Sequence, residues 1–332
     1  MSILVVLDVN DEHKETLKRA AGDAEIIFSS PSEVTDEMAM DADVIIGNIK
    51  PAMIKDSKKL KLLQLESAGT DGYTVPGAIP SETVLANATG SYGLAISEHM
   101  IGSLLTVMKK LDLYRLNQEQ NLWKDEGPVT SVYGSKTLVV GFGDIGSEFA
   151  MRMHAMGSEV SAIRRNKTDK PDYIKALYQM DKLNECLEEA DIVAICLPGT
   201  PETYKLFNAE TLSHMKKGSY LINVGRGNIV DSDALADVLC DGHLAGACVD
   251  VTDPEPLPAD HKLWNAPNIL ITPHISGGHH LLETHNRIVG IAARNIGHFL
   301  AGEEYENIVD MKTGYRTWGR FFCNEERPSG PR

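Results

Sequence analysis

The stretch Thr137-Leu138-Val139-Val140-Gly141-Phe142-Gly143-Asp144-Ile145-Gly146 decides the fold of this chain. Its first four residues predict a buried strand, and a helix-like segment, Ser147–Met156, follows the last glycine. A GxGxxG pattern between a strand and a helix is typical of a dinucleotide-binding turn. Gly141 permits the tight turn, Gly143 lets the backbone approach a pyrophosphate, and Gly146 lets helix and strand pack closely. The amides at the start of the helix would receive the phosphates.

Short apolar runs alternate with helix-like segments on both sides of this turn. After it, strands are expected at 159–163, 192–197, 219–223, 246–249 and 269–272. Before it, strands are expected at 3–8, 25–28, 43–47, 62–65 and 83–86, and helices at 11–21 and 32–40. Continuous apolar strands separated by helices indicate parallel sheets that are covered on both faces.

Two long helical patterns, Gly93–Leu111 and Leu281–Leu300, would carry the chain between the two series of strands, and residues 121–135 are expected to form a loop. A length of 332 residues also favours two domains. We therefore expect an α/β fold with two doubly wound parallel-sheet domains. A Rossmann cofactor domain, residues 95–285, would be inserted into a flavodoxin-like substrate-binding domain formed by residues 1–94 and 286–332.

Charge and composition exclude several classes of function. The net charge is −15 and the pI is about 5.2, so nucleic acid and anionic membranes are not expected partners. The five cysteines include no C-x-x-C pair, which argues against a disulfide framework or a zinc site. Neither a secretory signal nor a membrane span is recognisable, so a cytoplasmic location is expected.

The end of the strand 159–163 predicts the choice of cofactor. NAD-binding turns usually have an acidic residue here for the ribose 2′-hydroxyl, but this chain has Arg164-Arg165-Asn166. Two guanidinium groups suit a 2′-phosphate, which they can bind through charge-assisted hydrogen bonds. We therefore expect a preference for NADP(H), with NAD(H) as the alternative if both arginines point into solvent.

Three segments that follow later strands carry the residues suited to reducing a 2-keto acid. Arg226 lies between glycines in Asn223-Val224-Gly225-Arg226-Gly227, Glu255 lies in Asp253-Pro254-Glu255-Pro256, and His274 lies in Thr272-Pro273-His274. Arginine can hold a substrate carboxylate with two hydrogen bonds. Histidine titrates near neutral pH and can donate the proton, and a neighbouring carboxylate stabilises its charged form and fixes its tautomer.

With these motifs in this order, the sequence resembles the D-isomer-specific 2-hydroxyacid dehydrogenase family from about Asp43 to Ile308. Further matching segments are Ser67-Ala68-Gly69-Thr70-Asp71 and Leu197-Pro198 with Thr203. The resemblance implies Arg226, Glu255 and His274 as catalytic residues, and Ser67, Ala68, Gly69, Arg226 and His274 as substrate contacts. The resemblance and the glycine turn together give these cofactor contacts: Gly141, Gly143, Asp144, Ile145, Gly146, Arg164, Arg165, Leu197, Pro198, Thr203, Val224, Gly225, Arg226, Asp250, His274, Ser276 and Gly277.

A short chain with an expected NADP preference is most similar to the glyoxylate/hydroxypyruvate reductases of this family. The resemblance implies a homodimer acting on a small 2-keto or 2-hydroxy acid. A D-3-phosphoglycerate or D-lactate dehydrogenase is the alternative, and a non-enzymatic dinucleotide-sensing corepressor is a more distant one. No metal is expected, since His279, His280 and His285 suggest a polar loop rather than a ligand set. Glu98-His99 is expected to serve packing or interdomain contact.

Overall fold

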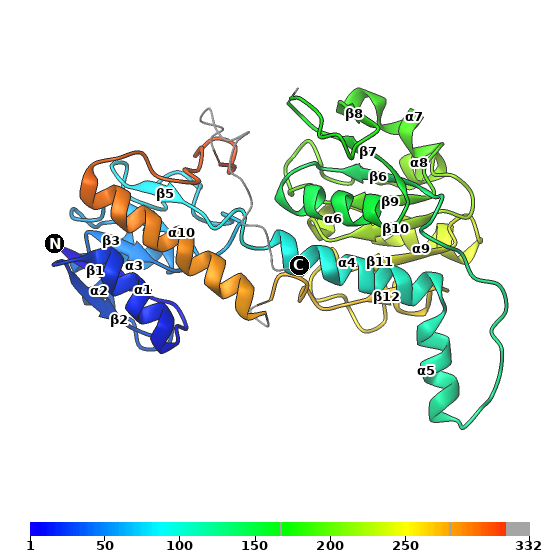
Figure 1. Cartoon of the computed structure of the whole chain (residues 1–332), viewed down its shortest axis with the longest axis horizontal. Coiled ribbons are helices and arrows are strands. Elements are labelled where there is room, and N and C mark those ends of the chain that lie inside the picture. The colour runs from blue at the N-terminus through cyan, green and yellow to red at the C-terminus, as the bar shows by residue number, and fades with distance from the viewer. Residues whose placement is uncertain (167, 279–280, 317–332) are drawn as a thin grey trace. The chain divides into compact units, whose positions relative to one another are not determined.

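The computed structural model describes residues 1–166, 168–278 and 281–316 (Figure 1). The chain divides into two compact units. One is the continuous segment Tyr92–Leu281, and the other combines Met1–Ser91 with the described residues from Leu282 onward. The continuous unit is thus inserted into the other, which agrees with the predicted fold.

The discontinuous unit contains a five-stranded parallel sheet in the order β2-β1-β3-β4-β5. This is the flavodoxin-like order, with its reversal between β1 and β3. The strands are β1 (Ser2–Val5), β2 (Glu25–Phe28), β3 (Val44–Ile46), β4 (Leu62–Gln64) and β5 (Val84–Ala86).

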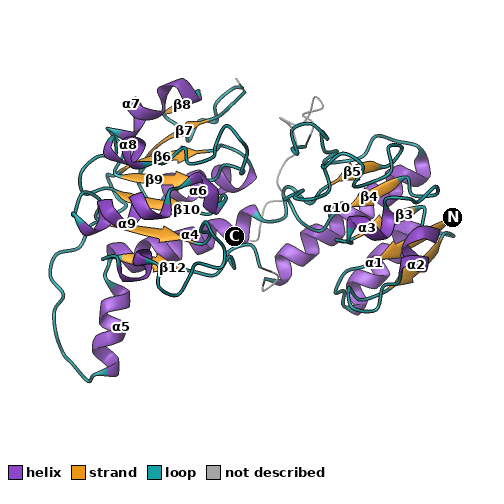
Figure 2. Cartoon of the chain, turned by 180° about the vertical axis from the view of Figure 1, so that it is seen from behind, coloured by secondary structure: helices purple, strands orange, loops and turns teal. Residues whose placement is uncertain are grey.

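Helices cover both faces of this sheet. They are α1 (Asp11–Ala21), α2 (Asp36–Asp41), α3 (Pro51–Ile54) and α10 (Leu282–Ala301). α1 packs against α10, and α2 packs against α3 (Figure 2). The bounds of α1 follow from its sequence, because the side chain of Asn10 accepts a hydrogen bond from the backbone amide of His13 and Gly22 ends the helix with a φ of 58°.

The continuous unit contains a seven-stranded parallel sheet in the order β12-β11-β10-β9-β6-β7-β8. Counted within the unit, this is the Rossmann order extended by one strand, with its reversal between β6 and β9. The strands are β6 (Lys136–Val140), β7 (Glu159–Ile163), β8 (Ala176–Tyr178), β9 (Ile192–Ile195), β10 (Tyr220–Asn223), β11 (Gly246–Val249) and β12 (Ile269–Ile271).

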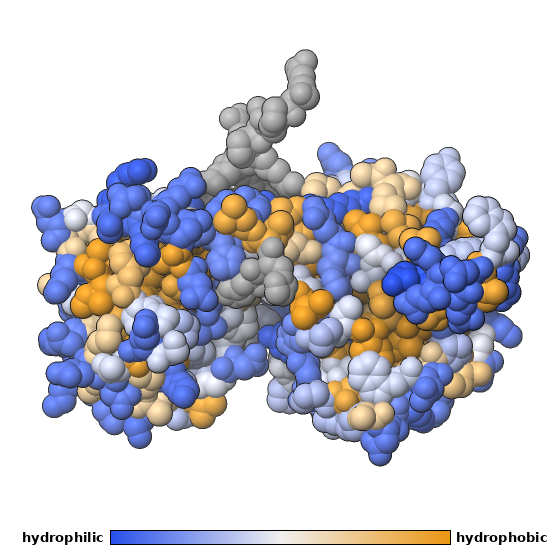
Figure 3. Space-filling model, turned by 90° about the horizontal axis from the view of Figure 1, so that it is seen from below, coloured by the Kyte–Doolittle hydropathy of each residue, from blue (hydrophilic) through white to orange (hydrophobic). Residues whose placement is uncertain are grey.

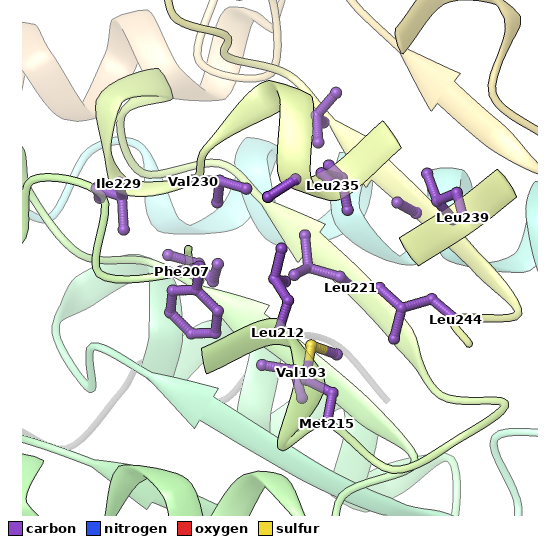
Figure 4. Packing of buried hydrophobic residues seen from close by; sticks show 14 of the residues in the cluster. Val193, Phe207, Leu212, Met215, Leu221, Ile229, Val230, Leu235, Leu239 and Leu244 are labelled. Carbon is purple, nitrogen blue, oxygen red and sulfur yellow. The ribbon is translucent and has the colours of Figure 1, made fainter. Parts of the chain in front are cut away.

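One face of the seven-stranded sheet carries a large apolar core (Figure 4). Val193 and Leu221 from the strands meet Phe207, Leu212 and Leu235, all of them at most 1% exposed. The helices over this face are α7 (Leu183–Leu187), α8 (Ala209–Ser213) and α9 (Ser232–Cys240). Burying side chains of this size contributes about 1.5–3 kcal/mol each to folding, which fixes the sheet whose edge carries the candidate site.

The remaining helices of this unit are α4 (Gly93–Met108), α5 (Leu111–Glu119) and α6 (Asp144–Ala155). α4 packs against α6, β11 and β12. The expected single helix Gly93–Leu111 instead ends at Met108, because Lys110 has a φ of 56° and starts the separate helix α5. α5 and the loop after it extend away from the sheet (Figures 1 and 2).

Three other expectations needed correction. β8 was not predicted, α2 begins at Asp36 rather than Ser32 because Thr35 caps it, and β1 ends at Val5 rather than Asp8.

On the face shown in Figure 3, hydrophilic residues surround scattered apolar patches. Among the described residues, no helix has the length and apolarity needed to cross a membrane.

Candidate active site

The glycine turn lies between β6 and α6, at the reversal of strand order where dinucleotides bind. Gly141 has a φ of 105°, and a Cβ there would lie 2.6 Å from the carbonyl oxygen of Cys196. A Cβ at Gly146 would lie 2.1 Å from the carbonyl oxygen of Gly141. A Cβ at Gly143 would meet nothing within 4 Å, which leaves open space beside the backbone. The turn therefore fits a pyrophosphate held by the first amides of α6.

Asp144 and Ile145 form the first turn of α6, as expected for backbone contacts to phosphate. The side chain of Asp144 also has another contact, because its Oδ2 accepts a hydrogen bond of 3.1 Å from the backbone amide of Gly93 at the start of α4. The carboxylate of Asp144 thus ties the glycine turn to α4.

Arg164 and Arg165 follow β7, the neighbour of β6 in the sheet. The backbone amide of Arg164 donates to the carbonyl oxygen of Tyr178, 2.9 Å away. Partial burial lowers the pKa of the Arg164 guanidinium. Arg165 is close enough to Glu202 to help lower the pKa of that carboxyl group, after a larger contribution from its hydrogen bond with Thr200. Both arginines thus occupy the expected position beside the turn.

The loops after β9 and β10 pack closely on each other. A Cβ at Gly225 would lie 2.3 Å from the carbonyl oxygen of Leu197, and Val224 is buried. Thr203 shapes the first loop, because its hydroxyl donates to the carbonyl oxygen of Pro198 at 2.7 Å and accepts from the amide of Thr200 at 2.8 Å. The hydroxyl of Thr203 is therefore engaged within its own loop.

The structure brings His274 and Glu255 together. His274 Nδ1 lies 2.6 Å from Glu255 Oε1, and both side chains are partly exposed, at 46% and 43%. A carboxylate only accepts hydrogen bonds, so Nδ1 carries the proton in this pair. The Nε2 atom of His274 is then the nitrogen that can exchange a proton with a ligand.

Arg226 follows β10, and its loop contacts the segment that leads to Glu255. A Cβ at Gly227 would lie 1.8 Å from the carbonyl oxygen of Thr252, so only glycine permits this approach. The Arg226 Nη1 donates to the carbonyl oxygen of Gly225 at 2.9 Å. The loops that carry Arg226, Glu255 and His274 thus follow the carboxyl ends of the three neighbouring strands β10, β11 and β12.

Asp250 connects these three loops. Its amide donates to the carbonyl oxygen of Asn223, 3.0 Å away, and its carbonyl oxygen accepts from the amide of His274 at 2.7 Å. Its carboxylate accepts from the amides of Ile275 and Ser276, both at 2.9 Å. Asp250 thus holds the loop of His274, whereas its expected contact with the cofactor stays a prediction. Gly277 packs against Ile96 of α4.

The expected substrate loop, Ser67 to Gly69, belongs to the discontinuous unit and follows β4. Ser67 Oγ donates to the carbonyl oxygen of Gly69 at 2.7 Å, and Asn87 Nδ2 donates to that of Ala68 at 2.8 Å. Glu66 directly precedes this loop, and its pKa is raised to about 7. Burial of the carboxyl group is the larger cause and the charge of Asp8 the smaller one, whereas a hydrogen bond from the backbone of Asn48 lowers the pKa. No motif in the sequence marks Glu66.

Two of the histidines considered for a metal, His279 and His280, lie outside the described residues. The third, His285, lies in α10, where its ring is parallel to that of His13 with centroids 6.3 Å apart. Among residues 1–166, 168–278 and 281–316, no three His, Cys, Asp or Glu side chains are placed to bind a metal ion.

Residues 101–276 match the family model described as "D-isomer specific 2-hydroxyacid dehydrogenase, NAD binding domain". The chain is 30% identical to a glyoxylate reductase of Thermofilum pendens over 274 residues, 81% of this chain and 80% of that protein.

Two solved structures of proteins with the same family description are also similar to this chain. A D-isomer specific 2-hydroxyacid dehydrogenase family protein from Aeromonas salmonicida is 31% identical, with a TM-score of 0.82 over 93% of this chain and 99% of that one. A D-isomer specific 2-hydroxyacid dehydrogenase from Xanthobacter autotrophicus Py2, in complex with NADPH and MES, is 25% identical, with a TM-score of 0.79 over 95% of this chain and 99% of that one.

Proposed function

Because the chain belongs to the D-isomer-specific 2-hydroxyacid dehydrogenase family, we propose that it reduces a small 2-keto acid of the glyoxylate or hydroxypyruvate type to a D-2-hydroxy acid, with NADPH preferred. The observation that carries the proposal is the His274–Glu255 pair. It lies at the same edge of the sheet as Arg226 and the glycine turn, where ligands of such folds bind.

Each residue of the site has a defined part in the reaction. A nicotinamide cofactor held by the glycine turn would supply a hydride to the carbonyl carbon. His274 gives a proton from Nε2 to the carbonyl oxygen, so that the reduced carbon bears a hydroxyl group. Glu255 holds Nδ1–H of the imidazole and stabilises the charged form that precedes this transfer. Arg226 binds the substrate carboxylate and orients the carbonyl group.

Arg164 and Arg165 support the preference for NADPH. Both residues follow β7, where the 2′ position of the adenosine ribose lies in Rossmann folds. NAD-binding turns usually have an acidic residue here that binds the free 2′-hydroxyl, and this chain has two arginines instead. The similar protein from Xanthobacter autotrophicus Py2 was solved with NADPH, which agrees with this choice.

The double variant Arg164→Ala/Arg165→Ala is expected to lower kcat/KM for NADPH at least about 100-fold, because it loses charge-assisted bonds to the 2′-phosphate that are worth about 1.5–3 kcal/mol each. The value for NADH should change less than about threefold, which makes NADH the internal control. Steady-state assays with each cofactor measure both values. Equal losses with the two cofactors would show that the arginines do not select the phosphate.

The charge around the expected substrate loop favours substrates without a second anionic group. Glu66 directly precedes Ser67, and Asp8 lies near enough to raise the pKa of Glu66. If Ser67 to Gly69 contact the substrate, a phosphate on the substrate would approach two carboxyl groups, and its charge would be repelled by Asp8 and by the ionised fraction of Glu66, about half at pH 7. This argues against the alternative of a D-3-phosphoglycerate dehydrogenase and leaves D-lactate dehydrogenase activity as the nearer competitor.

A matrix assay tests the proposal. NADPH and NADH are each combined with glyoxylate, hydroxypyruvate, pyruvate and phosphohydroxypyruvate, and cofactor oxidation is followed at equal enzyme concentration. We expect the highest kcat/KM with NADPH and glyoxylate or hydroxypyruvate. The highest value with pyruvate would favour a D-lactate dehydrogenase, and no turnover in any combination would favour the non-enzymatic corepressor.

The arm formed by α5 and the loop to Tyr133 supports the proposal of a homodimer. None of the residues of α5 is buried. Seven exposed large apolar side chains lie on this arm: Leu111, Tyr114, Leu116, Leu122, Trp123, Val129 and Tyr133. Such a concentration of apolar surface marks an interaction site, and a second copy of the chain with twofold symmetry is the commonest occupant for a soluble enzyme.

Sedimentation equilibrium should therefore give about twice the chain mass at micromolar concentration. The double variant Leu116→Glu/Trp123→Glu should give the monomer mass with an unchanged circular dichroism spectrum, because both side chains are exposed in the single chain. The matched control is Val75→Glu, an exposed apolar residue of the other unit, which should remain a dimer. A wild-type protein of monomer mass would refute this partner.

A further inference from the structure

A series of hydrogen-bonded side chains joins α4 to the loop that carries His274. The Nε2 atom of His99, in α4, lies 3.1 Å from Thr272 Oγ1. Thr272 Oγ1 in turn lies 2.6 Å from Asp250 Oδ1. Thr272 directly follows β12 and precedes His274 by two residues. All four residues belong to the continuous unit.

The direction of these hydrogen bonds follows from the number of protons available. A carboxylate only accepts, so the single hydroxyl proton of Thr272 is donated to Asp250. The hydroxyl oxygen of Thr272 must then accept from His99, which therefore carries its proton on Nε2. The same Nε2 lies 4.0 Å from Asp250 Oδ1, which adds attraction whenever the imidazole is charged.

Asp250 passes this restraint to the backbone around His274. Only 2% of Asp250 is exposed, and its two carboxylate oxygens accept from the amides of Ile275 and Ser276. His274 has a φ of 54°, a left-handed conformation that is unfavourable for a residue other than glycine. Such a conformation persists when its surroundings fix it from several sides, as the Asp250 contacts do here.

We propose that His99 is a positioning residue, which orients the proton-donating imidazole of His274 through Thr272 and Asp250. This inference rests on the proposed function. His99 holds Thr272, Thr272 holds the Asp250 carboxylate, and that carboxylate fixes the two amides that follow His274. Loss of the His99 donor leaves the Thr272 hydroxyl free to turn away from Asp250, which loosens the carboxylate and misplaces the imidazole relative to the substrate.

The test uses one variant that removes the N–H donor of His99 but keeps a ring, and one that keeps the donor but removes the ring. His99, Thr272 and Asp250 line a cavity of about 10 Å³, so a small residue at position 99 would also enlarge a void. His99→Phe keeps a ring without a donor, whereas His99→Gln keeps an N–H donor near the position of Nε2. His243→Gln is the control, because the imidazole of His243, in the same unit, bonds the carbonyl oxygen of Met215 at 2.8 Å.

We expect His99→Phe to lower kcat about 10- to 100-fold, with KM for NADPH within about twofold of wild type. His99→Gln should recover most of the loss, and His243→Gln should match wild type. Thr272→Val breaks the same link, so the double variant His99→Phe/Thr272→Val should lose no more than the worse single variant. A full kcat in His99→Phe, no recovery in His99→Gln, or additive losses in the double variant would overturn the proposal.

A second readout needs no catalysis. Hydrogen exchange of the Ile275 and Ser276 amides should be at least about 10-fold faster in His99→Phe than in wild type or His99→Gln. If the wild-type protein reduces no keto acid, the proposed function fails, and this exchange still decides whether His99 holds the loop. Unchanged exchange in His99→Phe would refute the link itself.

Discussion

Replacing His274 by asparagine is expected to lower kcat for the keto acid about 1,000-fold, because general acid catalysis of this kind contributes about 10²–10⁴-fold. Asparagine can still donate to Glu255 from the position of Nδ1, but it has no group that releases a proton at Nε2. It also tolerates the left-handed backbone that position 274 requires, where φ is 54°. The variant thus removes the chemistry and leaves the loop in place.

Two measurements separate chemistry from folding in this variant. The dissociation constant for NADPH, measured by quenching of protein fluorescence, should stay within about threefold of wild type. The thermal midpoint should move by less than about 3 °C, which corresponds to a change of less than about 1 kcal/mol in the free energy of unfolding. A kcat within about threefold of wild type in His274→Asn would remove His274 from the proposed mechanism.

The second large effect is expected at Arg226. Arg226→Lys keeps the positive charge but loses the planar fork that binds a carboxylate with two bonds. Loss of one such charge-assisted bond, about 1.5–3 kcal/mol, lowers kcat/KM for the keto acid about 10- to 100-fold. KM should rise more than kcat falls, because the bond to the carboxylate is made before the transition state as well as in it.

Oxalate, a dicarboxylate that cannot accept a hydride, isolates the binding step. Its inhibition constant against the keto acid should rise in Arg226→Lys in proportion to KM. Arg294→Lys serves as the control, since Arg294 pairs with Glu306 in the discontinuous unit. Unchanged oxalate inhibition in Arg226→Lys would mean that another group binds the substrate carboxylate.

The sequence allowed the fold to be predicted where local signals agree with burial. The central strands of both sheets, such as β3, β9 and β10, are apolar runs buried on two faces. The strands β2, β7 and β11 have the expected bounds. The helix α1 was also predicted at its true bounds, because Asn10 and Gly22 mark its ends. The carboxyl ends of β10 to β12 are neighbours in a parallel sheet, so the sequence alone predicted that their loops would meet.

The elements that were missed lack such signals. β8 is a three-residue edge strand whose side chains are only partly buried, so its apolar pattern is weak. α5 buries none of its residues, so its apolar side chains mark no face that packs on the core. The contact between His99 and Thr272 joins residues 173 positions apart in the chain. Packing or interdomain contact was expected for His99, whereas the structure gives it a polar bond to the loop of His274.

The order of strands in the seven-stranded sheet has a consequence for how such enzymes diversify. Arg164 and Arg165 follow β7, on one side of the reversal between β6 and β9, whereas Arg226, Glu255 and His274 follow β10 to β12 on the other. If these residues have the proposed roles, a change in cofactor preference and a change in the reacting groups require mutations in separate halves of one sheet. Selection could exchange either trait while the other remains intact, and a designer could graft the β7 exit loop without disturbing turnover.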